Sequence, residues 1–261
     1  MKKLLGILLL IFSLIHLGFL EKKYAIQEGT KTIVIDAGHG GKDPGAMYAG
    51  KKEKEVALAV ALKVGKLLED SIPNVKILYT RKSDIFVELW ERTNIANKAK
   101  ADLFISIHCN AADNTSAEGT ETFVMGLHKN ESNLEVAKRE NASILLEENY
   151  QKNENYGGFD PNSPVGHIIF SMFQNAYLNR SLDLASKVEN EFRTTTQLKS
   201  RGVKQAGFLV LWKSSMPSVL IEIGFLSNQK DREYMTSSEG QDNISHSIFK
   251  AVNNFTNSKT N

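Results

Sequence analysis

The sequence predicts an α/β fold: a single domain in which helices flank a twisted, mainly parallel six-stranded sheet, with a helical insert. Two observations support this. Apolar runs typical of buried strands alternate along the chain with segments whose apolar residues recur at helical spacing, and this alternation indicates a parallel sheet covered on both faces. The chain has 261 residues, 41% of them hydrophobic, which is enough for one substantial core.

Residues 1–20 have the pattern of a signal peptide or N-terminal anchor, and residues 21–30 are expected to be a linker. Lys2 and Lys3 precede an apolar run from Leu4 to Leu20. No clear small-residue cleavage site follows, so an uncleaved anchor stays open, although the run is short for a membrane span. The two lysines favour a cytoplasmic N-terminus and an exported remainder, in the periplasm or cell envelope. Contact with a membrane is expected only through this segment.

Residues 31–258 hold the predicted domain. Strands are expected at residues 32–36, 75–79, 102–107, 120–125, 208–211 and 218–223. Helices are expected at residues 53–68, 87–99 and 241–255. The interval 126–200 interrupts the alternation and is interpreted as a helical, regulatory insert. Within it we expect a polar helix at 132–150, a loop at 151–163 and a longer helix at 165–197.

Charge and cysteine content argue against a nucleic-acid-binding protein and against a fold held together by intramolecular disulfides. The 32 basic and 30 acidic residues nearly cancel, whereas nucleic-acid binding needs a concentrated basic surface. The single cysteine, Cys109, cannot form an intramolecular disulfide. The fold must therefore depend on its core.

Four candidate functional residues lie at or near strand ends, where ligands bind in open α/β sheets. His39 follows the first strand in a glycine-rich loop, His108 ends the third, Glu222 lies in the last strand and Glu53 opens the first helix. Two histidines and a carboxylate form a common catalytic zinc site. Structural roles compete with this interpretation, because strand-end histidines and helix-start glutamates are often only structural. Glu222 interrupts an apolar strand, so its carboxylate needs a partner or a raised pKa.

Neighbouring residues offer alternatives that spacing does not settle. Glu53 and Glu55 point to roughly opposite helix faces, so only one can face a metal. Cys109 alternates with His108 along its strand and is expected to face the core. The remaining histidines of the predicted domain lack strand-end context and are expected at the surface. They are His128, His167 and His246.

Several separated segments resemble the zinc-dependent N-acetylmuramoyl-L-alanine amidases of bacterial cell walls, of the cell-separation type. The resemblance runs in order from about Ile33 to Tyr234 and covers nearly all of the exported chain. The segments are IDAGHGGKDPGA, KKEKEVALAVA, TRKSDIFVELWERTNIANKAKADLFISIHCNA, QAGFLVL and MPSVLIEIGFLSN.

The resemblance implies a role for each matching residue. His39, Glu53 and His108 look like zinc ligands, and Glu222 looks like the catalytic glutamate. The implied reaction is hydrolysis of the amide bond between N-acetylmuramic acid and L-alanine in peptidoglycan, during wall remodelling or daughter-cell separation. Arg81, Arg92 and Asn97 match motif positions as structural or substrate-facing residues, and no substrate-binding residue is assigned. The glycines around His39 are expected to leave space beside the zinc for a glycopeptide.

The insert resembles the extra segment of division-associated relatives. In those, a helix blocks the zinc site until an activator protein moves it. Five glutamates in or beside the predicted helix could approach the metal, and the sequence does not single one out. They are Glu131, Glu135, Glu140, Glu147 and Glu148. Rival functions are a wall-binding protein with an inactive metal site, and a zinc carboxypeptidase or deacetylase of similar geometry.

Overall fold

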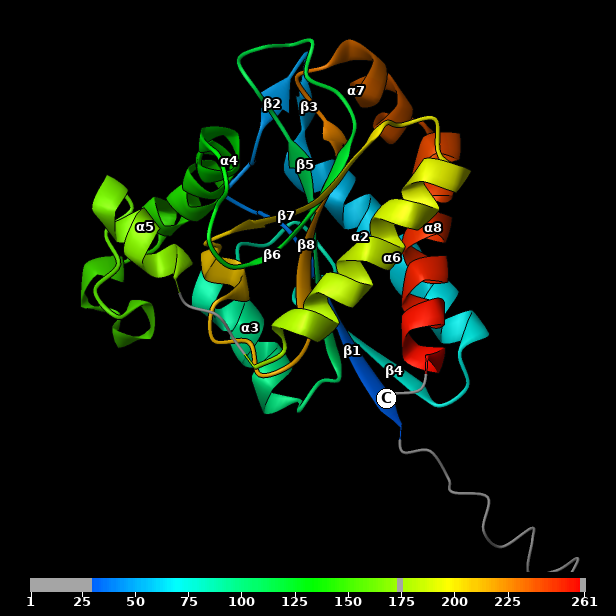
Figure 1. Ribbon diagram of the computed structural model, residues 1–261, viewed down its shortest axis with the longest axis horizontal. Coiled ribbons are helices and arrows are strands. Elements are labelled where there is room, and N and C mark those ends of the chain that lie inside the picture. The colour runs from blue at the N-terminus through cyan, green and yellow to red at the C-terminus, as the bar shows by residue number, and fades with distance from the viewer. Residues whose placement is uncertain (1–29, 173–175, 259–261) are drawn as a thin grey trace, which may run out of the picture. The chain divides into compact units, whose positions relative to one another are not determined.

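The computed structural model describes residues 30–172 and 176–258. Residues from Lys31 onward form one compact unit, built on a six-stranded sheet with the strand order β4-β1-β5-β8-β6-β7 (Figure 1). Only the β6–β8 pair is antiparallel among the pairs of this sheet, so the predicted mainly parallel α/β fold is confirmed. The strands are β1 (Lys31–Ala37), β4 (Val75–Tyr79), β5 (Leu103–Asn110), β6 (Thr120–Met125), β7 (Ser200–Ala206) and β8 (Ser218–Phe225).

Helices cover both faces of the sheet (Figure 1). Each face has its own apolar core. One core joins β1, β5 and β8 to α2 (Glu53–Ser71), α6 (Leu178–Thr195) and α8 (Ser238–Asn257). The other joins the opposite face to α3 (Leu89–Lys98) and α4 (Glu131–Asn141). Three further elements are the short hairpin of β2 (Met47–Tyr48) and β3 (Lys51–Lys52), and the helix α7 (Gln229–Thr236). The central strands are buried on both faces, which explains their continuous apolar sequences.

One predicted strand is wrong. Residues 208–211 form a 3₁₀ turn, Leu209–Leu211, buried in the second core. The sixth strand is instead β7, which pairs only with β6 at the edge of the sheet. Its sequence SRGVKQA is polar because an edge strand is partly exposed. A short buried apolar run fits a strand and a turn equally well, so its composition gave the wrong element.

The interval 126–200 divides into two parts. The predicted helix at 132–150 ends earlier, as α4, and continues through 3₁₀ turns at Ala142–Leu146, Tyr150–Lys152 and Glu154–Tyr156. The predicted longer helix is two helices, α5 (Pro164–Ser171) and α6. Leu184, Val188 and Phe192 of α6 are buried in the first core, so α6 belongs to the layer that covers the sheet. Residues 131–171 are called the α4–α5 segment below.

The expected signal or anchor lies outside the described residues. In the part of the chain that is described, no helix has the length and apolar character needed to cross a membrane.

Candidate metal centre and active site

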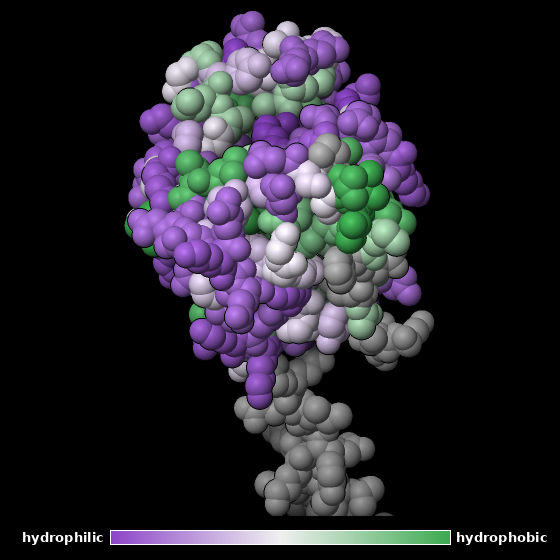
Figure 2. Space-filling view, turned by 90° about the vertical axis from the view of Figure 1, so that its left-hand side faces the viewer, coloured by the Kyte–Doolittle hydropathy of each residue, from purple (hydrophilic) through white to green (hydrophobic). Residues whose placement is uncertain are grey.

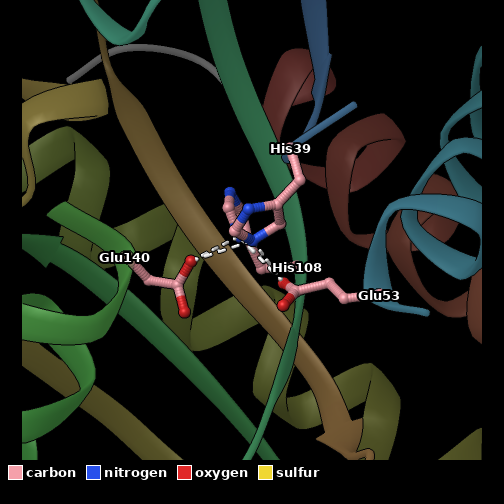
Figure 3. A group of neighbouring side chains, drawn as sticks. All are labelled: His39, Glu53, His108 and Glu140. Atoms are coloured by element: carbon pink, nitrogen blue, oxygen red, sulfur yellow. Dashed lines mark hydrogen bonds and ion pairs between the residues drawn. The ribbon is translucent and has the colours of Figure 1, made fainter. Parts of the chain in front are cut away.

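Four buried side chains converge at the ends of β1 and β5 (Figure 3). His39 comes from the loop after β1, Glu53 begins α2, His108 lies in β5 and Glu140 lies in the last turn of α4. Nε2 of His39 is 3.0 Å from Oε1 of Glu53 and 3.1 Å from Oε2 of Glu140. Nδ1 of His108 is 3.1 Å and 3.0 Å from the same two oxygens. One nitrogen or oxygen of each residue thus lies within 4.8 Å of the others.

His39 is oriented by the loop that follows it. Its backbone adopts a left-handed conformation, with φ at 59°, and Gly40 and Asp43 close the loop with two backbone hydrogen bonds of 2.9 and 3.1 Å. Nδ1 of His39 lies 2.8 Å from Oδ2 of Asp43. Because an ionised carboxylate can only accept, Nδ1 carries a proton, and Nε2 is the ring nitrogen that faces the cluster. Ser143, from the α4–α5 segment, donates to the same oxygen at 2.7 Å.

Two glycines of this loop make room for the site's own side chains. A Cβ on Gly38 would lie 2.4 Å from the His108 ring, and one on Gly45 would lie 2.6 Å from Oε2 of Glu53. The expectation that the loop glycines leave space for a glycopeptide is therefore corrected at these positions, because protein atoms already fill it. Gly45 also has φ at 63°, which glycine adopts without strain.

Glu53 is held by backbone N–H groups on both oxygens. Oε2 accepts from Ala46 at 2.8 Å, and Oε1 accepts from Cys109 at 2.9 Å. Glu55 is exposed and lies 3.9 Å from Lys52. The geometry thus brings Glu53, and not Glu55, to the two histidines. Cys109 contributes only its backbone to the site, and its side chain lies in the first core, as predicted.

Glu222 lies beside His108, because these residues are register partners on β8 and β5. Its side chain is fully buried, and neither oxygen has a hydrogen-bond partner. Burial, together with the carboxylates of Glu140 and Glu53, raises the pKa of Glu222 well above its usual range. Arg139 opposes this, with Nη2 at 3.9 Å from Oε1 of Glu222. The unpartnered carboxyl group is thus suited to accept and return a proton.

The electrostatics of the cluster suit a divalent cation. Burial lowers the pKa of His108, but Glu140 and Glu53 outweigh it and raise the value to about 9. The pKa of His39 is raised well above normal against burial, chiefly by Glu53. The two carboxylates thus favour added positive charge at the two rings. A divalent cation brings such charge, and a set of two imidazoles with carboxylates fits zinc.

Comparison with known proteins identifies the family. The sequence profile of the N-acetylmuramoyl-L-alanine amidase family matches residues 33–254. The chain belongs to this family. It is therefore an amidase, a hydrolase of an amide bond, and the resemblance seen in its sequence is confirmed.

Individual relatives agree with the family assignment. The N-acetylmuramoyl-L-alanine amidase AmiA of Escherichia coli K12 is 31% identical over 238 residues, which cover 90% of this chain and 79% of AmiA. AmiC of Escherichia coli O6:H1 is 32% identical over 223 residues, and the chain spans about half of it, 51%. The solved structure of the amidase AmiC2 of Nostoc punctiforme has a TM-score of 0.64 at 28% identity and covers 88% of this chain and 99% of its own.

Two arginines that match the family's motif positions hold the amidase's site loop in place. Arg81 donates to the backbone carbonyls of Ala37 and Gly38 at 2.9 and 2.7 Å. Arg92 donates to the His39 carbonyl at 2.9 Å, and its guanidinium pairs with the buried carboxylate of Asp36 at 2.9 Å. Both side chains are buried, so they act on the structure of the loop.

The other residues considered from the sequence lie elsewhere in the amidase. Asn97 donates to the carbonyl of Lys213 at 2.9 Å and takes no part in the cluster. His246 is exposed and His128 is partly exposed. The expectation that His167 is a surface residue is wrong, because its ring is buried against Phe159.

The sequence alone does not single out Glu140 among the five glutamates, but the helical spacing between Glu140 and the apolar residues before it indicates that its side chain is buried. Glu140 continues the buried face of α4, which includes Asn133, Val136 and Ala137 at helical intervals. A carboxylate on a buried helix face needs a partner, and none of the other four candidate glutamates joins the cluster. Glu147 is also buried, but it accepts from the backbone N–H of Leu89 at 2.7 Å, at the start of α3.

Proposed function

We propose that this amidase binds zinc through His39, Glu53 and His108, and that it hydrolyses the bond between N-acetylmuramic acid and L-alanine in peptidoglycan. The observation that carries the proposal is the convergence of these three residues beside the unpartnered carboxyl group of Glu222. A bound zinc ion would supply Lewis acidity toward the amide carbonyl and lower the pKa of water.

The chain's own residues perform the proton transfers. Glu222 takes a proton from the attacking water and then delivers it to the departing amine of L-alanine. Its burial keeps competing hydrogen-bond donors away from the carboxyl group. Asp43 holds the His39 ring in one orientation, and the two backbone N–H groups on Glu53 hold its carboxylate in place.

We infer that the resting enzyme is blocked by the α4–α5 segment. A catalytic zinc site keeps one position open for water or substrate. Oε2 of Glu140, which is 3.1 Å from His39 and 3.0 Å from His108, would fill that position. Arg139, the residue before it, lies against Glu222 and donates to the Ala111 carbonyl at 2.6 Å. Displacing α4 would remove both side chains from the site.

An activator protein that moves the segment is part of the proposal. α5 and the residue after it expose several large apolar side chains, with fractions from 46% to 63%. Figure 2 views the side that carries α4 and α5, and green apolar groups are exposed there among hydrophilic ones. Exposed apolar groups of this kind mark interaction sites. The exposed apolar side chains of α5 and of the residue after it are Val165, Ile168, Ile169 and Met172.

The proposed site of action is outside the cytoplasm, because peptidoglycan lies there. Residues 1–20 would direct export to the periplasm or cell envelope, as a cleaved signal or as an anchor, and residues 21–30 would link them to the catalytic domain at 31–258. The proposed role is wall remodelling or daughter-cell separation.

Product analysis tests the function directly. Purified full-length protein, wild type and Glu140→Ala, is incubated with peptidoglycan, with and without a chelator and with zinc added back. Mass spectrometry should find intact glycan and stem peptides that begin with a free L-alanine amine, formed only with metal. Release of a terminal D-amino acid would indicate a carboxypeptidase, and release of acetate a deacetylase. Wall binding without any product would indicate the scaffold function.

A further inference from the structure

A groove beside Glu222 is lined by both apolar residues and polar side chains that the reaction chemistry does not use. It encloses about 600 Å³. We call it the Arg201 groove. Its lining includes Tyr48, Asn110, Glu121, Arg139, Arg201 and Phe225. Arg139 lies 3.9 Å from Glu222, and Glu121 is the register partner of Glu222 on β6. The groove therefore adjoins the catalytic carboxyl group.

The topology explains why a basic group lies at this place. β6 runs antiparallel to β8, so its first residues lie at the edge where β5 and β8 end. β7 runs parallel to β6, with Thr120 beside Ser200, so β7 also begins at this edge. Arg201 is thus two strands from Glu222, roughly 10 Å at the usual strand spacing. That separation is the length of two to three extended residues.

Arg201 is held in position while most of its guanidinium is left for a ligand. Nε donates to the buried carboxylate of Glu121, and the group stacks over the Phe225 ring at 5.2 Å. Nη1 lies 3.5 Å from the Glu118 carbonyl, at the outer limit of a hydrogen bond. The side chain is 31% exposed and lines the groove. Its remaining N–H groups form a fork suited to a carboxylate.

The charge next to Arg201 favours an acidic group of a ligand at that point of the groove. Glu121 also pairs with Lys204, whose Nζ lies 3.1 Å from Oε1. The carboxylate of Glu121 thus faces two cations, so it does not by itself cancel the charge of Arg201. The lining also includes Asp113 and Glu135, so the positive charge is local to Arg201. Glu121, Arg201 and Lys204 are all on strands of the sheet, so their arrangement does not depend on where α4 lies.

We propose that Arg201 binds the free carboxylate of the second residue of the peptide stem, and so sets substrate preference. In the stem, L-alanine is followed by a glutamate joined through its side-chain carboxyl group, which leaves the main-chain carboxylate free. With the scissile amide at Glu222, that carboxylate lies about two residues away, within reach of Arg201. The inference rests on the proposed amidase reaction and adds a specificity residue to it.

The test compares two substrates that differ at one group. Muramyl peptides with either a carboxylate or a primary amide on the second residue are cleaved by full-length protein in the Glu140→Ala background. With Arg201→Ala, we expect KM for the carboxylate substrate to rise about 10-fold or more, with kcat changed less than about twofold. The amide substrate should show little change, and Arg201→Lys should restore part of the lost affinity.

Lys66→Ala is the charge control. It removes a positive charge from an exposed position of α2 that does not line the groove, so KM should stay close to the background value. Equal effects of Arg201→Ala on both substrates, or no effect, would overturn the inference. If neither substrate is cleaved, the proposed function fails. Calorimetry then tests the subsite separately, by measuring how tightly the L-alanyl-glutamyl peptide binds to the Glu140→Ala protein with and without Arg201→Ala. The proposed subsite requires weaker binding when Arg201 is replaced, and equal binding would refute it.

Discussion

Oε2 of Glu140 lies 3.0 Å from Nδ1 of His108. The two residues come from different layers of the fold, since His108 is in the central strand β5 and Glu140 is on a helix outside the sheet. The same oxygen lies 3.1 Å from His39. A carboxylate in this place completes a closed, four-ligand set of the kind found in structural rather than catalytic zinc sites.

Removing this carboxylate should activate the enzyme. Glu140→Ala is expected to raise basal hydrolysis about 10-fold or more, because a charge-assisted contact at the open position is lost. A point substitution is preferable to deleting α4, since Val136 and Ala137 are packed in the second core. The measurement is release of dye-labelled peptidoglycan without a partner. Glu131→Ala, on the exposed side of the same helix, is the control, and equal rates for both variants would refute the block.

Glu222→Gln should abolish turnover and leave the metal bound. The neutral amide cannot accept the proton, so a loss of about 10²- to 10⁴-fold in kcat is expected. Zinc content, measured by atomic emission on the purified protein, should match that of the wild type, because Glu222 is not among the four converging ligand atoms. Turnover at the wild-type rate would exclude Glu222 as the base.

A pair of neighbouring glutamates separates metal binding from surface charge. Glu53→Gln should weaken zinc binding by more than about 100-fold, since even the loss of a supporting group costs about 10- to 100-fold. Glu55→Gln removes the same charge from an exposed position and should bind zinc normally. Competition with a chromophoric chelator measures both affinities. Normal affinity in Glu53→Gln would remove Glu53 from the ligand set.

A buried carboxylate that is not part of the metal cluster, Glu189, predicts how stability changes with pH. Burial raises the pKa of Glu189 above its usual value, against hydrogen bonds from Ser200, Thr122 and Thr120. The folded state therefore holds this proton more tightly than the unfolded chain, and the stability gained in acid is lost as pH rises through the raised pKa. The free energy of unfolding of wild type relative to Glu189→Gln should fall from pH 4.5 toward neutrality.

Urea denaturation at several pH values measures this difference. Glu191→Gln, on the same helix and partly exposed, serves as the control for a general change of charge. The interpretation of Glu189 fails if the wild type gains stability over Glu189→Gln as the pH rises, or if the wild type and both variants follow one curve.

Part of the site could be predicted from sequence because it depends on strand ends. His39 and His108 follow or end apolar runs, and Glu222 interrupts one, so topology alone places them at one edge of the sheet. Glu53 was different. Helical periodicity does not distinguish Glu53 from Glu55 as the metal ligand, and only the family resemblance favours Glu53. The structure then brings Glu53 to the histidines.

The remaining features depend on packing between distant segments. Which glutamate of α4 reaches His39 depends on how that helix lies on the second core, and the sequence does not state this. Arg201 lies on β7, an edge strand. The sequence of this strand is polar, so a search for apolar runs does not detect it. The apolar run at 208–211 was mistaken for that strand, because both a turn and a strand can bury such a run.

The α4–α5 segment is joined to the sheet at both of its ends, by β6 before it and by α6 after it. In the proposed block, the carboxylate of Glu140 would therefore be a competitor covalently attached to its own site, at an effective concentration set by the chain and unaffected by dilution. Inhibition of this kind needs no second molecule and is restored whenever the helix is released. An activator must consequently hold the helix away for as long as the enzyme works, so wall cleavage would last no longer than the activator's own residence on the protein.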